Sequence, residues 1–160
     1  MNIRKFPDPI LRFQTNKVVS VGDEERKILD EMTKTMYISQ GVGIAATQVG
    51  IKEQFAVVNV GDGLIKLINP VITSRDGTET QEEGCLSIPG TTVKVRRAKK
   101  ITVQYMDENG EVRQLRAEGL LARAIQHEID HLNGKVIIDY LNPIKKALTK
   151  RGLRLKSRNT

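Results

Sequence analysis

The sequence predicts a single α+β domain, in which antiparallel or mixed sheets pack around a central helix. Three observations support this prediction. The chain has 160 residues, the size of one domain. Its apolar residues first follow helical spacing, then form strand-like runs, and return to helical spacing near the end. The strand-like runs are joined by short turns of the hairpin type, which favours an α+β domain over a doubly wound parallel sheet.

The first expected element is a helix over residues 24–39. Apolar side chains recur there at helical spacing: Ile28, Leu29, Met32 and Met36. Asp23 is placed to cap the N-terminus of this helix. The glycine-rich segment 41–50 then ends it.

Strands are expected in the middle of the chain. "QFAVVNV" (54–60) and "LIKLINPVI" (64–72) are β-rich runs separated by the turn "GDG". "TTVKVRR" (91–97) alternates between apolar and polar residues, as a half-buried strand does. "ITVQYMD" and "EVRQLRA" flank "ENG", which predicts a hairpin.

A second helix is expected over residues 119–133, with Gly134 in the position that commonly follows a helix end. On a helical wheel, His127 and His131 lie next to each other on the flank of the apolar stripe. Both imidazoles can therefore reach one metal ion. Glu128 falls inside the apolar stripe, where burial raises a carboxyl pKa towards the range of a general acid or base.

A catalytic tetrahedral metal needs a third protein ligand and one open position. The pattern H-E-x-x-H-x-x-G-x-x-H fails here, because its last position is Ile137. Cys85 is the only cysteine, and with His127 and His131 it would complete a set of three ligands. A structural zinc site normally takes four such ligands, so the set of three favours a catalytic site.

The segment "GVGIAA" (41–46) superficially fits a dinucleotide-binding fingerprint. A predicted helix precedes it, however, whereas the fingerprint requires a strand, so no nucleotide cofactor is expected. Its small residues would let a substrate backbone approach closely. Gln48 follows this run and offers an amide donor that could stabilise a developing oxyanion.

Composition and charge indicate the cellular location of the protein and the kind of partner that it could contact. No apolar run is long enough to span a membrane, the start lacks a secretory signal pattern, and a single cysteine allows no internal disulfide. We therefore expect a cytoplasmic protein. Residues 145–160 carry seven basic residues and no acid, whereas the basic residues elsewhere equal the 19 acidic residues in number. This basic tail is expected either to be solvated or to contact a polyanion.

Three segments together resemble the peptide deformylase family: "GVGIAATQ" (41–48), "EGCLS" (83–87) and "QHEIDH" (126–131). The opening "FPDPILR" is also similar to the start of that family. The resemblance extends to about residue 144, so a catalytic domain over residues 1–144 and a tail over 145–160 are expected. It implies an α+β fold and a metal-dependent hydrolase that removes the formyl group from N-formyl-methionyl nascent peptides.

The resemblance also implies roles for individual residues. Cys85, His127 and His131 would bind one divalent metal ion, Fe²⁺ natively, with Zn²⁺, Ni²⁺ or Co²⁺ able to replace it. Glu128 would be the general acid/base, and Gln48 with the backbone N–H of Leu86 would stabilise the oxyanion. Three positions match residues whose main chain pairs with the substrate: Val42, Gly43 and Gly84. Leu120 and Ala124 share the flank of the histidines on the wheel and are expected to line the methionine pocket.

Two other functions stay open from the residues. One is a zinc peptidase of the H-E-x-x-H type. The other is a basic RNA-binding module in which the metal is structural. A combination is also possible, in which the tail of the enzyme contacts the ribosome.

Overall fold

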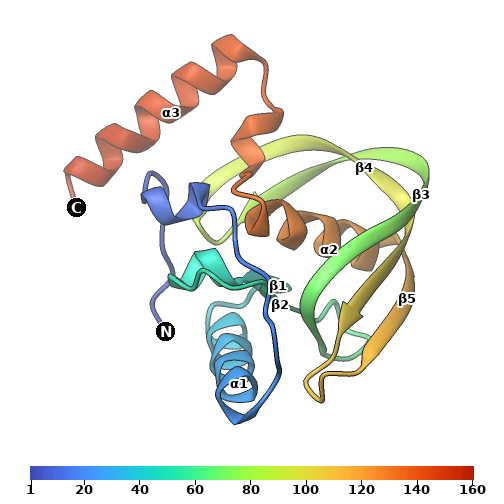
Figure 1. The fold of residues 1–160 in the computed structure, drawn as a ribbon. Coiled ribbons are helices and arrows are strands. Elements are labelled where there is room, and N and C mark those ends of the chain that lie inside the picture. The colour runs from blue at the N-terminus through green and yellow to red at the C-terminus, as the bar shows by residue number, and fades with distance from the viewer.

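The computed structural model describes residues 1–160 and confirms the α+β fold (Figure 1). Its single sheet has the order β1-β2-β3-β4-β5, and all neighbouring strands are antiparallel. The bounds are β1 Gly43–Ala45, β2 Phe55–Val58, β3 Ile65–Cys85, β4 Ile88–Met106 and β5 Val112–Glu118. The long β3–β4 hairpin curves around the central helix α2 (Gly119–Leu132), as predicted for the helix that carries both histidines.

Helix α1 (Asp23–Ile38) matches the predicted helix, and its residues Leu29, Met32 and Met36 are fully buried. The predicted cap was wrong. Gly22 is the capping residue, and its N–H donates to the Glu25 carboxylate at 2.7 Å. Asp23 is instead the first helical residue and pairs with Arg26, because a glutamate three residues after the cap can reach back to its N–H.

Strand β3 extends well beyond the predicted apolar run, which ended at Ile72. Its second half is polar and mostly exposed, yet it pairs with β4 as far as Cys85 opposite Ile88. The pairing partner includes the predicted alternating strand 91–97. Backbone hydrogen bonds to β4 hold the polar segment in the sheet. Apolar patterning alone does not predict that this segment is a strand.

Helix α2 ends where the sequence predicted. Gly134 follows it with φ +75°, and a Cβ there would lie 2.6 Å from the carbonyl oxygen of Arg12. The helix is joined to β4 by Gln126, whose amide bonds both the N–H and the carbonyl of Ala98 at 3.0 Å. Ile125 on the same helix is fully buried. These contacts fix α2 against the hairpin.

Two hydrophobic clusters form the core. The larger one joins α1, the sheet and α2, and includes Ile125 and Leu132. The smaller one joins the first residues of β4, next to the β3–β4 turn, to the 3₁₀ helices η1 (Pro9–Arg12) and η3 (Ile137–Tyr140). Cys85 packs against this cluster. A third 3₁₀ helix, η2 (Ala46–Val49), follows β1. Cys85 and the histidine helix therefore meet where the two clusters adjoin.

The basic tail forms helix α3 (Pro143–Arg158), which lies on the outside of the molecule (Figure 1). None of its residues is buried. It is attached at two places: Lys146 in its first turn contacts Asp139 at 2.8 Å, and Leu153 in its second half packs against the smaller cluster. No helix of the protein is long and apolar enough to cross a membrane.

Candidate active site

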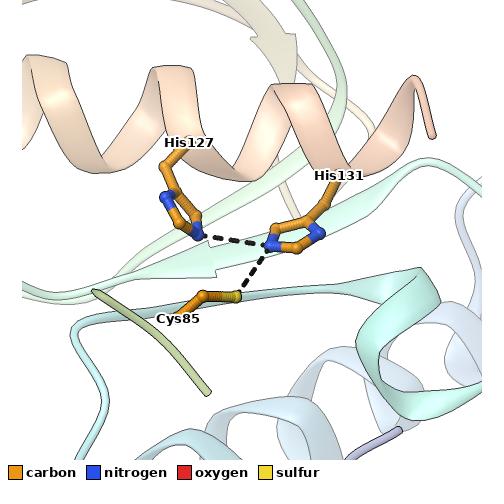
Figure 2. A group of neighbouring side chains, drawn as sticks. All are labelled: Cys85, His127 and His131. Atoms are coloured by element: carbon orange, nitrogen blue, oxygen red, sulfur yellow. Dashed lines mark hydrogen bonds between the residues drawn. The ribbon is translucent and has the colours of Figure 1, made fainter. Parts of the chain in front are cut away.

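The three predicted metal ligands lie together in the fold (Figure 2). Nε2 of His131 lies 3.2 Å from Nε2 of His127 and 3.3 Å from Sγ of Cys85, and all the ligand atoms lie within 4.8 Å of one another. Ligands of a tetrahedral metal at ordinary bond lengths lie roughly 3.3–3.8 Å apart. The set therefore fits a single metal ion.

Two elements bring these ligands together. Helix α2 places His127 and His131 one turn apart on one side, as the i, i+4 spacing requires. Cys85 is the last residue of β3, and an irregularity in the β3–β4 register lies between Glu83 and Cys85. Such a bulge re-aims the side chain that follows it. The sulfur thus faces the helix across the end of the hairpin.

The two histidines differ in their surroundings. Nδ1 of His127 lies 2.9 Å from the Glu83 carboxylate, which leaves its Nε2 to face the cluster. Burial lowers the pKa of His127, but Cys85 and Glu83 outweigh this effect and raise the pKa to about 10. Burial and the charge of His127 hold the pKa of His131 well below its usual value. Because a metal binds neutral imidazole, ion binding would displace a proton from His127.

Glu128 is buried, as its place on the wheel predicted, and is only 4% exposed. Its Oε2 has no hydrogen-bond partner, and burial raises its pKa to about 7. A Cβ on Gly43 would lie 2.5 Å from its Oε1, so only glycine leaves room for this carboxylate. The geometry supplies a carboxyl group that can exchange a proton near neutral pH.

Gln48 is buried and has a fixed amide orientation. Its Oε1 accepts from the N–H of Ala45 at 2.9 Å. Its amide nitrogen therefore points the other way, 3.2 Å from Oγ of Ser87 and 3.6 Å from Sγ of Cys85. The side chain presents an N–H donor beside the candidate metal ligands, where a developing oxyanion could be held.

A cavity of about 500 Å³ opens over these residues. The other residues predicted to take part in the site also line it: Val42, Gly43, Gly84, Leu86, Leu120 and Ala124. Leu120 is half exposed at the rim, whereas Ala124 is buried deeper on the same helix. His131 does not line the cavity and lies behind the other ligands.

Sequence reasoning missed a group of buried charges at the cavity, two of which, Glu83 and Arg123, line it. Glu83, Arg97 and Arg123 are each less than 8% exposed, and both arginines donate hydrogen bonds to the Glu83 carboxylate. Burial alone would raise the pKa of Glu83, but His127 and Arg97 lower it to about 2. The wheel contained a signal for one of them, since Arg123 precedes His127 by one helical turn and lies on the same side.

Comparisons with known proteins bear on the whole chain. A family model described as polypeptide deformylase matches residues 1–147. A peptide deformylase of Halothermothrix orenii is 49% identical over 141 residues, which cover 87% of this chain and 92% of the relative.

Solved structures show the same similarity. The crystal structure of a peptide deformylase from Legionella pneumophila has a TM-score of 0.91 at 38% identity, and the match covers 98% of this chain and 95% of that chain. That of the Ehrlichia chaffeensis peptide deformylase in complex with actinonin has a TM-score of 0.95 at 38% identity, covering 99% and 98%. The likeness therefore spans most of the length of each protein.

Proposed function

The chain belongs to the polypeptide deformylase family, and from that membership we propose how its own residues carry out deformylation. The protein is a hydrolase that removes the formyl group from the N-terminal formyl-methionine of nascent polypeptides and releases formate. One observation carries the residue-level proposal. A thiol, the His127 imidazole, a buried carboxyl group and an oriented amide donor line one cavity, and the second imidazole, that of His131, lies within ligand distance of the thiol and of His127.

Cys85, His127 and His131 hold the metal. The distances between their ligand atoms and their mixed thiolate and imidazole chemistry support this assignment. When bound, such an ion lowers the pKa of water and polarises a carbonyl group. The native ion is Fe²⁺, and Zn²⁺, Ni²⁺ or Co²⁺ can replace it, because all of them accept sulfur and imidazole nitrogen ligands.

Glu128 moves the protons of the reaction. It accepts a proton from the water that attacks the formyl carbon and passes a proton to the nitrogen of the departing amine. Gln48 and the N–H of Leu86 hold the formyl oxygen while it becomes negative. The bond between the formyl carbon and the nitrogen then breaks, leaving formate and a free amino terminus.

The substrate peptide lies along the cavity. Its main chain pairs with Val42, Gly43 and Gly84 as an added strand. Leu120 and Ala124, which line the cavity one helical turn apart, contact the methionine side chain. A small pocket of this kind suits an unbranched, flexible apolar side chain.

Residues 1–144 form the catalytic domain and 145–160 the basic tail, which docks on ribosomal RNA near emerging chains in the cytoplasm. The exposure of α3 and its charge support this placement. The two other functions are not favoured. The matches are to deformylases along most of the chain, and none of those reported is to a peptidase or an RNA-binding protein.

The test uses formyl-Met-Ala and unformylated peptides with the metal-loaded protein. We expect release of formate from the formylated peptide and no cleavage of internal peptide bonds. Cleavage of the unformylated peptides would support the peptidase instead. Tight, sequence-selective RNA binding without hydrolysis would support the binding module.

A further inference from the structure

Glu83 is a buried carboxylate that hydrogen-bonds a candidate metal ligand, His127. We propose that Glu83, held between Arg97 and Arg123, is a positioning residue that fixes His127 and the strand of Cys85 in metal-binding geometry. The inference rests on the metal site proposed above. It concerns how the protein prepares that site before an ion arrives.

The carboxylate of Glu83 is fully engaged. Arg97 donates to both of its oxygens, at 2.9 and 2.8 Å, and Arg123 donates to Oε2 at 2.6 Å. The remaining contact is with Nδ1 of His127 at 2.9 Å. Since the carboxylate can only accept, Nδ1 must carry a hydrogen, and the proton that an ion displaces is that of Nε2, whose lone pair then faces Cys85 and His131.

The same contacts join the two elements that supply the ligands. Glu83 lies on β3, two residues before Cys85, whereas Arg123 and His127 lie on α2. Arg123 also donates to the carbonyl of Val95 at 2.9 Å and to that of Glu79 at 2.8 Å. The histidine helix is thereby tied to both strands of the hairpin within reach of the ligands.

Arg97 closes this arrangement into a ring. From β4 it reaches Asp130 on α2 at 2.6 Å, and Tyr140 of η3 donates to the same carboxylate at 2.5 Å. Asp130 lies on the helix that carries His127. The ring therefore runs from β3 to β4, on to α2 and back, and every charged member has an opposite charge beside it.

Packing alone does not explain a ring of this kind. Apolar side chains could hold the strand against the helix at least as firmly, because buried ion pairs are weak contributors to stability. What apolar contacts cannot do is orient an imidazole ring, which needs a directional hydrogen bond at Nδ1. Removing such a partner typically weakens metal binding about 10–100-fold.

The test is a titration of Co²⁺ into the metal-free protein, followed by the visible absorption of the cobalt ion and its bond to sulfur. Glu83→Gln is expected to bind Co²⁺ about 10–100-fold more weakly than wild type and to show an altered spectrum at saturation. Glu108→Gln is the control, because Glu108 also pairs with a cation, the partly buried Lys66, but lies outside the ring. This control should leave both readouts unchanged.

A merely structural role would lower the melting temperature of Glu83→Gln while its saturated spectrum stayed that of wild type, and this result would overturn the proposal. So would unchanged Co²⁺ affinity. If Glu83→Gln fails to fold, Asp130→Asn is the second test. It removes the charge of Asp130, which pairs with Arg97, the arginine that in turn holds Glu83. Asp130→Asn should weaken Co²⁺ binding several-fold, and unchanged binding would overturn the proposal.

The wild-type titration separates this inference from the proposed function. If wild type binds Co²⁺ without absorption from a sulfur bond, the metal site itself is wrong. If wild type shows that absorption at one ion per chain and Glu83→Gln behaves identically, only the role of Glu83 fails.

Discussion

At the scale of single residues, the site depends on the buried carboxyl group of Glu128. Glu128→Gln preserves the shape of the side chain and removes its capacity to exchange a proton. We expect kcat for formate release to fall about 10²–10⁴-fold, the usual contribution of a general acid or base. Metal content should match that of wild type, because Glu128 is not among the clustered ligands. A variant with normal kcat would exclude Glu128 as the proton carrier.

Gly43 offers a second residue-level prediction. Because a Cβ there would lie 2.5 Å from Oε1 of Glu128, Gly43→Ala should displace the carboxylate and lower kcat. We expect a loss of at least about tenfold, since small displacements of reacting groups cost about 10²-fold in related cases. Gly152→Ala is the control, because no atom lies within 4 Å of the added Cβ and the site is distant in sequence. Equal activity of the two variants would contradict the steric argument.

The number of residues of each type explains which site residues could be predicted from the sequence. The chain has only two histidines and one cysteine, so there were few candidates for a sulfur or imidazole ligand. Glu128 stood out because a helical wheel places it among leucines and isoleucines. Glu83 is one of 19 acidic residues, and its burial depends on two arginines that come from other elements. No local sequence pattern predicts the contact of Glu83 with these two arginines.

At the scale of elements, patterning located strands β2 to β5 and both core helices but not their full extent, and it did not predict β1 within the glycine-rich segment. Apolar spacing placed α1 and α2 to within a residue or two. The polar half of β3 gave no such signal, because its backbone bonds to β4 do not depend on side-chain type. The tail was predicted only as a charged segment, whereas Asn142 caps a helix there by accepting from the N–H of Lys145 at 2.8 Å.

The attachment of α3 gives a prediction about pH. Partial burial would raise the pKa of Asp139, but hydrogen bonds from Arg12 and Lys146 outweigh it and hold that pKa well below its usual value. Its stabilising effect is therefore present above the unfolded pKa of about 3.9 and is lost as the pH falls through the folded pKa. We expect Asp139→Asn to lower the free energy of unfolding by roughly 1–2 kcal/mol at pH 7.

Urea unfolding of both proteins between pH 7 and pH 3 measures this effect. The difference in unfolding free energy should stay constant down to about pH 5 and narrow below about pH 4. Asp107→Asn is a useful comparison, because Asp107 pairs with Arg113 at an exposed turn and should contribute less. A difference that grows on acidification would contradict the assigned direction of the pKa shift.

At the scale of the whole molecule, the basic excess is confined to one exposed helix. A chain ending at residue 144 should keep the kcat of the full chain on formyl-Met-Ala, because no residue of α3 lines the cavity. It should lose ribosome co-sedimentation, and the salt dependence of the full chain should reflect several phosphate contacts, with a slope of about −0.7 to −0.9 per contact. Unchanged co-sedimentation after truncation would remove the proposed role of the tail.

The overall fold and activity could be predicted because several independent patterns agree. The segments with helical spacing form helices, and the predicted hairpin turn joins β4 to β5. The three motifs meet at one site. The sheet proved to be antiparallel throughout, and the closure of the hairpin around α2 could not be read from local patterns. That closure depends on charges and amides, such as Gln126 on Ala98, whose partners are distant in sequence.

The most direct test of the account compares wild type with Cys85→Ser, each purified without oxygen and assayed for metal content and formate release on the same sample. We predict one metal ion per chain and release of formate from formyl-Met-Ala for wild type, and loss of both for Cys85→Ser. Full metal occupancy and turnover in Cys85→Ser would contradict the assignment of the thiolate and the two histidines as the metal-binding set.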